Sequence, residues 1–334
     1  MKQYLDAVRE VLTTGTRKEN RTGVDTLSTF NVNYEIDLRE GFPLLTTKKI
    51  NWKNIVVENM WFLSGQPDIS ILQAHGCKFW DAWVEPSPFG GGRVPSAYGN
   101  FWRNFPIHDA DDPQTNIVPG AFNDQIAWAV AELKRNPNSR RVVISAWAPG
   151  NAQTSRLPPC HIVFVLNVQN LKTRHAPACP SRFPGPDALG NRCNPCNCGA
   201  PEQPTTPHLC LHLTQRSCDI ALGVPYNIAG YAFLLELFSR FTGIPAGIFA
   251  HTLVDAHAYT AKPDGSMAEY DHVPGLREQL TREPKPLPRL EIDEAVDSLD
   301  DLDWLLELPT AELMERFKLV GYDPHPAIPF RVAV

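Results

Sequence analysis

Residues 157–166 read LPPCHIVFVL, and this stretch decides much of the fold. The run that starts at His161 is short, apolar and rich in β-branched residues, which is typical of a buried strand. Two other stretches have the same character: RVVISAW at 141–147, and HLCLHLTQRSCD at 208–219. In the second, Leu209, Leu211 and Leu213 occupy alternate positions. The sequence therefore predicts three successive strands.

Helical patterns lie between and after these strands. The stretch DQIAWAVAELKRN at 124–136 repeats apolar residues at helical spacing, and NIAGYAFLLELFSRFTG at 227–243 is apolar on nearly all sides, as in a buried helix that ends at Gly243. Strands and helices do not alternate regularly, as they would in a doubly wound parallel sheet. We therefore predict an α+β fold with a mixed β-sheet flanked by helices.

Composition excludes several kinds of protein. The chain has 334 residues, of which 43% are hydrophobic, so it can bury a large core. Its net charge of −6 disfavours general binding to nucleic acid, and any phosphate must be bound by a few placed arginines. No apolar run reaches membrane-spanning length, and residues 1–12 have the spacing of an amphipathic helix instead of a signal peptide. We expect a soluble, cytoplasmic protein with no membrane partner.

One segment, at about 171–207, is full of Pro, Gly and Asn and interrupts what is otherwise a hairpin. We interpret the chain as a single catalytic domain, 1–334, with this segment as a loop insertion. Five of the eight cysteines lie between 179 and 210, and CNPC at 193–196 has the spacing of a zinc knuckle. Zinc ligands could come from Cys193, Cys196 and Cys198, together with Cys179 or Cys210 and His175 or His208. Because a second CxxC is missing, we favour a loop without metal.

Two residues stand out as candidates for chemistry. Cys160 precedes a strand, where it could be a small core residue or, with His161, Arg140, Arg141 and Arg216 nearby, a thiolate nucleophile. Glu58 interrupts the apolar helical run NIVVENMWFL, and burial there would raise its pKa towards neutrality, which suits a general acid or base.

Eleven motifs, in order along the chain, resemble those of the thymidylate synthase family. They are NRTG (20–23), FPLLTTKK (42–49), ENMWFLSG (58–65), FWDAW (79–83), AYGNFWR (97–103), NPNSRRVVISAW (136–147), LPPCH (157–161), QRSCDIALGVPYNIAGYA (215–232), DAHAY (255–259), REPKPLP (282–288) and GYDPHPAI (321–328). The resemblance implies a thymidylate synthase-like fold in which a large mixed sheet forms a homodimer interface through one face.

The resemblance also implies an activity, the transfer of a one-carbon unit from 5,10-methylenetetrahydrofolate to C5 of dUMP. In this scheme Cys160 adds to C6 of the uracil, and Glu58 manages proton transfers with water. The other catalytic positions that match the family are His161, Tyr98, Asp219 and Asn227. Reductive methylation would give dTMP and dihydrofolate.

Further positions match the family's binding residues. For the nucleotide, the phosphate ligands would be Arg21, Arg216 and Ser217, with Arg140 and Arg141 supplied by the partner of a homodimer; Asn227 would read uracil, and His257 and Tyr259 the deoxyribose 3′-hydroxyl. The positions that match the family's folate-binding residues are Trp80, Trp83, Asp219, Leu157, Leu222, Gly223 and Tyr226.

Several positions near this expected pocket depart from the family's pattern. They are Ser96 and Ala97 for Pro-Val, Phe101 for Gln, Ala148 for Asn, Tyr226 for Phe, Val254 for Gly, and Ala261 and Lys262 for Asn-His. Such changes leave open an alternative, hydroxymethylation by water to 5-hydroxymethyl-dUMP with release of tetrahydrofolate. The retained Trp80 and Trp83 and the C-terminal RVAV favour methylation, because hydride transfer needs a dry site.

Overall fold

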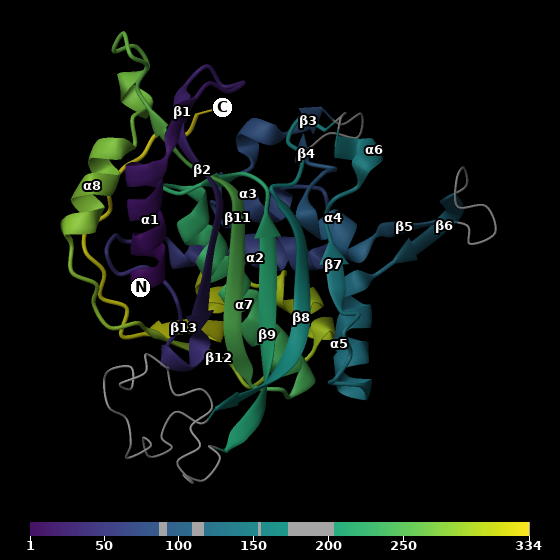
Figure 1. Cartoon of the computed structure of the whole chain (residues 1–334). Helices are drawn as coiled ribbons and strands as arrows, with labels where there is room; N and C mark the ends of the chain where they lie inside the picture. The colour runs from purple at the N-terminus through teal and green to yellow at the C-terminus, as the bar shows by residue number, and fades with distance from the viewer. Residues whose placement is uncertain (87–91, 109–116, 153–154, 173–203, 334) are drawn as a thin grey trace, which may run out of the picture.

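A large β-sheet forms the centre of the molecule in a computed structural model, which describes residues 1–86, 92–108, 117–152, 155–172 and 204–333. Its strands are β1 (Thr16–Lys18), β2 (Asp25–Asp37), β7 (Val143–Ser145), β8 (His161–Lys172), β9 (Thr205–Gln215), β10 (Cys218–Asp219) and β11 (Ala246–Thr260). They form a seven-stranded sheet in the order β1-β2-β11-β9-β8-β7, with β10 paired to β11 (Figure 1).

This sheet is mixed. Strand β11 runs antiparallel to β2 and parallel to β9 and β10, whereas β8 runs antiparallel to both β9 and β7. The three predicted strands are β7, β8 and β9, and they lie side by side. The structure confirms both the strands and the mixed α+β class.

Helices cover one face of the sheet. The longer ones are α1 (Lys2–Thr14), α2 (Trp52–Ser64), α5 (Gln125–Arg135), α7 (Gly223–Thr242) and α8 (Val273–Thr281). Helix α7 packs on β9 and β11, and α2 packs on α7, so both lie behind the sheet in Figure 1. No helix in the described ranges crosses the opposite face of the sheet (Figure 1).

Helix α7 is the buried helix that the sequence predicts. Phe233 and Phe238 are almost fully buried on it, and the helix ends at Gly243, whose φ of 74° is the left-handed conformation that glycine adopts without strain. Helix α2 begins at the cap Asn51, whose side chain accepts a hydrogen bond from the backbone N–H of Asn54. It carries Glu58 into the interior.

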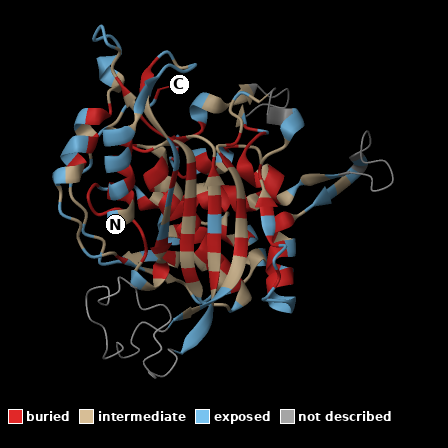
Figure 2. Cartoon of the chain, viewed as in Figure 1, coloured by how far each residue is buried: buried red, intermediate tan, exposed pale blue. Residues whose placement is uncertain are grey.

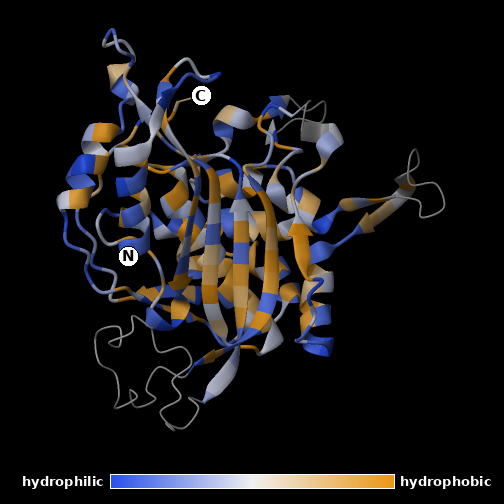
Figure 3. Ribbon diagram, viewed as in Figure 1, coloured by the Kyte–Doolittle hydropathy of each residue, from blue (hydrophilic) through white to orange (hydrophobic). Residues whose placement is uncertain are grey.

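Buried side chains alternate along the central strands (Figure 2). The apolar residues of β9 and β11 that point towards α7, such as Leu211, Leu213, Phe249 and Leu253, are at most 1% exposed. Hydrophobic residues accordingly gather on the strands and on the helices behind them (Figure 3). The core therefore lies between the sheet and the layer of α2 and α7.

Shorter elements surround this core. The helices are α3 (Ser70–Ala74), α4 (Tyr98–Arg103), α6 (Pro149–Ala152), α9 (Leu302–Leu305) and α10 (Thr310–Arg316), and the strands are β3 (Glu85–Pro86), β4 (Gly92–Arg93), β5 (Phe105–His108), β6 (Ile117–Asn123), β12 (Arg289–Ile292) and β13 (Phe317–Val320). Strands β5 and β6 form a hairpin that projects from the body (Figure 1). No helix of the described residues is long and apolar enough to cross a membrane.

The predicted interruption of a hairpin falls between β8 and β9. These strands pair from His161 opposite Gln215 as far as Lys172 opposite Thr205. Regular pairing thus reaches slightly into the predicted limits, 171–207, at both ends. The intervening residues 173–203, and with them His175, Cys179, Cys193, Cys196 and Cys198, lie outside the described part of the chain.

Candidate active site

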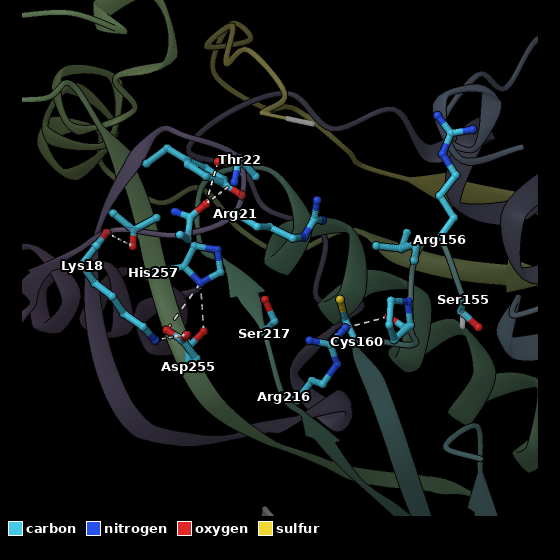
Figure 4. A pocket seen from close by; sticks show the side chains of 15 residues that line it. Lys18, Arg21, Thr22, Ser155, Arg156, Cys160, Arg216, Ser217, Asp255 and His257 are labelled. Atoms are coloured by element: carbon cyan, nitrogen blue, oxygen red, sulfur yellow. Dashed lines mark hydrogen bonds and ion pairs between the residues drawn. The ribbon is translucent and has the colours of Figure 1, made fainter. Parts of the chain in front are cut away.

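A cavity of about 500 Å³ opens where the turn before β8, the β1–β2 connection and the adjoining parts of β9–β11 meet (Figure 4). It brings together segments that are more than a hundred residues apart in the sequence. Its lining residues are Lys18, Asn20, Arg21, Thr22, Thr26, Ser155, Arg156, Leu157, Pro158, Cys160, Arg216, Ser217, Asp255, His257 and Tyr259. Six of the residues predicted to react with or bind the nucleotide line this cavity: Arg21, Cys160, Arg216, Ser217, His257 and Tyr259. Leu157, which was predicted to contact the folate, lines it as well.

Cys160 is held in this cavity by its backbone. Its N–H donates to the Tyr98 hydroxyl at 3.1 Å, and its carbonyl accepts from the Arg216 N–H at 2.8 Å. Burial raises the pKa of the Cys160 thiol, while Arg216, Arg21 and the Tyr98 hydroxyl act in the opposite direction. The thiol is therefore protonated in the single chain near neutral pH, and its nucleophilic form requires further help.

Positive charge is concentrated around the thiol. The Arg216 guanidinium donates to the carbonyls of Pro159 (2.9 Å) and Pro158 (2.7 Å), which fixes it over the cavity. The Arg21 guanidinium lies 5.8 Å from the centre of the Trp83 ring. With Lys18 and Arg156 on the same lining, these groups suit an anion such as a phosphate.

The loop that carries Arg21 is shaped by Asn20. The Asn20 side-chain oxygen accepts from the backbone N–H of Thr22 (2.9 Å) and from its hydroxyl (2.7 Å), and its amide donates to the Val24 carbonyl. These bonds form a turn of the kind that asparagine favours. The conformation of the 20–24 loop thus follows from local sequence, whereas its position beside Cys160 comes from β2.

Arg140 and Arg141 do not line this cavity. Both are exposed and precede β7 at the edge of the sheet. Within one chain, therefore, they are not part of the cavity around Cys160.

A carboxylate lies under the far side of the cavity. Asp255 on β11 accepts from Lys18 Nζ at 2.8 Å and from the Ser28 hydroxyl at 2.6 Å, and His257 Nδ1 lies 3.7 Å from it. His257, Lys18 and Ser28 hold the pKa of Asp255 well below its usual range, against the effect of burial. Burial alone would lower the pKa of His257, but Asp255 and Asp219 raise it above its usual value. Burial also raises the pKa of Tyr259 to about 12, so its hydroxyl keeps its proton.

A second cavity, of about 660 Å³, lies between α2, the 76–83 segment and the start of α7. Its lining residues are Asn54, Glu58, Gly76, Lys78, Phe79, Ala82, Trp83, Leu222, Gly223, Tyr226, Asn227 and Val332. It contains most of the predicted folate residues and Asn227. Two ring systems form one wall, since Phe79 and Tyr226 meet edge to face at 5.0 Å.

Glu58 reaches this second cavity from the middle of α2. Burial raises its pKa to about 7, although the indole N–H of Trp80 donates to its carboxylate at 2.8 Å and opposes the rise. A carboxyl group with this pKa can give and take protons at neutral pH. Trp80 itself is 7% exposed and lines neither cavity, so it contacts Glu58 from the interior, and Trp83 is the indole that lines the second cavity.

Asp219 lies just before α7, where its carboxylate accepts from the backbone N–H of Ala221 (2.9 Å) and Leu222 (3.1 Å). Burial alone would raise its pKa, but His272, His257 and the Leu222 N–H together hold that pKa below the usual range. Asp219 is therefore a partly buried carboxylate that is ionised near neutral pH. It borders both cavities through its neighbours without appearing in either lining.

His161 stacks on Tyr98 with ring centres 4.4 Å apart. Burial lowers the pKa of His161 to about 3, with the Asn227 side chain acting in the other direction, so the imidazole is neutral. The Tyr98 hydroxyl is bound to Cys160 and the Asn227 amide faces the second cavity. These three side chains thus connect the thiol to the cavity that contains Glu58.

Three candidate functional residues near these cavities were not predicted from the sequence. Lys18 and Asp255 lie inside motifs or beside them, but only the pairing of β11 with β2 brings them together. His272 is 1% exposed, has its ring centre 5.5 Å from that of Tyr259 and lies 3.7 Å from Asp219. The family's pattern has Asn-His where this chain has Ala261 and Lys262. Here the chain makes an excursion over 262–271, after which His272 lies beside Tyr259.

A thiol beside a cationic cavity, close to a carboxyl group that exchanges protons near pH 7, can add to an electron-poor carbon of an anionic substrate. The geometry thus suits an enzyme that forms a covalent bond between a cysteine and its substrate. The sequence profile of the thymidylate synthase family matches residues 2–334. A thymidylate synthase of Haloferax volcanii is 36% identical over 379 aligned residues, which cover 98% of this chain and 95% of the relative. The chain belongs to the thymidylate synthase family, whose members are enzymes that use a folate for one-carbon transfer.

The zinc hypothesis receives no support. Among the described residues, no group of three or more His, Cys, Asp or Glu side chains could hold a metal ion. Cys210 is on β9, where its sulfur accepts from the Ile248 N–H at 3.5 Å, and His208 bonds to Thr206. Four of the five cysteines concerned are outside the described ranges.

Proposed function

We propose that the chain catalyses the reductive methylation of dUMP to dTMP with 5,10-methylenetetrahydrofolate, acting as one domain over 1–334. The observation that carries the proposal is the pairing of Cys160, in a cationic cavity, with Glu58, whose pKa is about 7. Family membership and the name of the Haloferax volcanii relative support the same reaction.

In this reaction the cationic cavity binds the nucleotide. Arg21, Arg216 and Ser217 hold the phosphate, and His257 and Tyr259 contact the 3′-hydroxyl of the sugar. Cys160 then stands beside C6 of the uracil. Its Sγ forms a bond to C6 as its proton leaves, and the resulting enolate makes C5 a nucleophile.

Carbon 5 next attacks the methylene carbon of the folate, held between Trp83, Tyr226 and Leu222. Glu58, with water, carries protons to and from the pyrimidine and the folate. Loss of the C5 proton and departure of tetrahydrofolate leave an exocyclic methylene group on the ring. Hydride from tetrahydrofolate reduces this group to methyl, the Sγ–C6 bond breaks, and the products are dTMP and dihydrofolate.

A closed site favours hydride over water at that branch point. Val332 lines the second cavity together with Trp83, and the next residue, Ala333, is buried. The C-terminal segment therefore forms part of the wall of this cavity. This contact supports methylation rather than hydroxymethylation.

The proposed enzyme is a homodimer. The sheet face that no described helix covers offers a second copy a broad surface (Figure 1), and Phe30 on β2 is 80% exposed in the single chain. Arg140 and Arg141 are exposed at the edge of the same sheet and lie outside their own chain's cavity. In a dimer, the partner's Arg140 and the partner's Arg141 would join the phosphate site, and their charge would lower the pKa of Cys160.

The test is mass spectrometry of the nucleotide formed from dUMP and methylenetetrahydrofolate, with dihydrofolate measured in the same reaction. We expect dTMP and an equal amount of dihydrofolate. Hydroxymethyl-dUMP with tetrahydrofolate would establish the alternative reaction, and no modified nucleotide would overturn both.

A further inference from the structure

A line of polar side chains crosses the core face of the sheet behind the proposed base site. The Tyr34 hydroxyl lies 2.8 Å from His251 Nδ1, and His251 Nε2 lies 3.0 Å from Gln215 Oε1. Gln215 Nε2 in turn lies 3.0 Å from Asn227 Oδ1. The line thus joins β2, β11 and β9 to α7, and it ends at the amide that faces the second cavity.

These polar groups lie where the strands otherwise bury apolar ones. On β11, Phe249 and Leu253 flank His251 on the same face, and on β2, Val32 and Ile36 flank Tyr34. His251 is 1% exposed and Gln215 is 3% exposed. Because an unpaired polar group here would cost free energy, each member of the line needs its neighbour's hydrogen bond.

A backbone carbonyl sets the direction of these bonds. Gln215 Nε2 donates to the Ser217 carbonyl at 3.1 Å, and a carbonyl can only accept. The NH₂ group of Gln215 must therefore face both Ser217 and Asn227, which leaves its Oε1 facing His251. Asn227 must then present its oxygen to Gln215.

The direction continues through the histidine. An Oε1 acceptor requires that His251 Nε2 carry the hydrogen, so the neutral ring has an unprotonated Nδ1 that accepts from the Tyr34 hydroxyl. Burial lowers the pKa of His251 well below its usual value and raises that of Tyr34 well above. Both groups therefore stay neutral near neutral pH, and the order of donors and acceptors is stable.

We propose that Tyr34 and His251 are positioning residues that, through Gln215, fix the Asn227 amide with its NH₂ group towards the ligand. Asn227 Oδ1 is the atom that faces Gln215, and the side chain lines the second cavity, so Nδ2 is the amide atom that can donate to a ligand carbonyl there. The inference rests on the proposed function, because dUMP supplies that carbonyl at O4. One lone pair of Oδ1 remains to accept from N3–H.

The same order disfavours a cytosine edge. Cytosine has an amino group at C4 and an acceptor at N3, so it would need Asn227 turned over. A turned amide would set its NH₂ group against the NH₂ group of Gln215, and the whole line would have to reverse against the Ser217 carbonyl. Choice of base is thus enforced by residues that do not touch it.

The proposal is tested with Tyr34→Phe and His251→Phe, by measuring the binding of dUMP and dCMP to each variant and to wild type. We expect the preference for dUMP over dCMP to fall about tenfold, as for the loss of one ordinary hydrogen bond. KM for dUMP should rise more than kcat falls. His251→Gln, which retains a donor and an acceptor, should keep most of the preference.

Thr242→Val is the matched control. It lies at the far end of α7, where its hydroxyl donates to the Phe238 carbonyl and has no link to Asn227. Its preference should equal that of wild type. An unchanged preference in folded Tyr34→Phe and His251→Phe would overturn the proposal.

A second measurement does not depend on turnover. ¹⁵N NMR of labelled histidine should show that His251 of the wild-type protein carries its hydrogen on Nε2 and that Tyr34→Phe lets the hydrogen redistribute between the nitrogens. Hydrogen on Nδ1 in wild type would refute the proposed order directly. If wild type fails to bind dUMP while His251 has the expected tautomer, the proposed function fails and the order of the bonds stands.

Discussion

Glu58 is a carboxyl group whose acidity the fold changes strongly. Its displacement from a pKa of 4.5 to about 7 follows from burial in α2, and the single hydrogen bond from Trp80 is too weak to cancel it. Near pH 7 the protonated and ionised forms of Glu58 are therefore both populated in the folded protein, whereas an exposed glutamate would be ionised.

This displacement predicts a pH-dependent stability. The folded protein retains the Glu58 proton between about pH 4.5 and 7, where the unfolded chain releases it, so stability falls across this range as pH rises. Glu58→Gln should leave stability almost unchanged near pH 4 and increase it by about 2 kcal/mol at pH 8, since the site's water tempers the full effect. Chemical denaturation at both pH values measures this; an equal effect at the two would contradict a raised pKa.

Cys160 provides a second prediction at this scale. In Cys160→Ser the hydroxyl cannot form the anion near neutral pH, so turnover should fall by more than about a thousandfold. Binding of dUMP should remain, because Arg21 and Arg216 hold their positions without the sulfur. Product assay and calorimetry give the two readouts. A variant that still turns over would show that Cys160 is only a small core residue.

At the scale of elements, the contact between α2 and α4 holds the site together. Gly99 lies so close to α2 that an added Cβ would be 2.0 Å from the Phe62 carbonyl oxygen. Helix α4 begins with Tyr98, whose hydroxyl binds the Cys160 N–H. The position of the thiol therefore depends on how closely these two helices approach.

Gly99→Ala should push α4 away from α2 and destabilise the protein by about 1–3 kcal/mol, as overpacking does. Activity should fall in the remaining folded protein, since Tyr98 moves with α4. Gly150→Ala in α6 is the control, because a Cβ there meets nothing within 4 Å. Thermal unfolding and kcat measure both effects, and equal behaviour of the two variants would exclude a role for the close approach.

The C-terminal region shows how element boundaries depend on context. The acidic stretch after 290 has the composition of one amphipathic helical region, but it contains a strand pair, β12 with β13, and two short helices, α9 and α10. Pro309 lies between these helices and caps the start of α10. The helices still bury Leu305 and Leu313, so the apolar stripe is present in separate pieces.

At the scale of the whole molecule, a dimer would explain why two adjacent arginines are exposed outside their own chain's cavity. If the partner's Arg140 and the partner's Arg141 complete each phosphate site, two inactive variants should rescue each other. Cys160→Ser lacks the nucleophile, and Arg140→Ala/Arg141→Ala lacks the donated charges.

Equal mixing of these variants, after dissociation and reassociation, should restore about a quarter of wild-type activity, because half of the dimers are mixed and each has one intact site. Steady-state assays of the mixture and of each variant alone provide the comparison. Absence of recovery in mixtures that contain mixed dimers would show that both arginines act within their own chain or not at all.

The sequence alone determined the parts that depend on local pattern. Apolar periodicity identified β7, β8, β9, α5 and α7, because a residue's spacing along a strand or helix decides which face it can bury. Ordered motifs identified the family and the candidate residues, and Pro, Gly and Asn marked the break between β8 and β9.

Tertiary structure decided what depends on distant contacts. The order of strands brings Arg21 and Lys18 to Cys160, and the return of the chain after 262–271 puts His272 beside Asp219. The pKa of Glu58 and the polar line from Tyr34 to Asn227 likewise arise only after folding. The physical reason is that burial and hydrogen-bond direction are properties of surroundings, which segments far apart in sequence supply together.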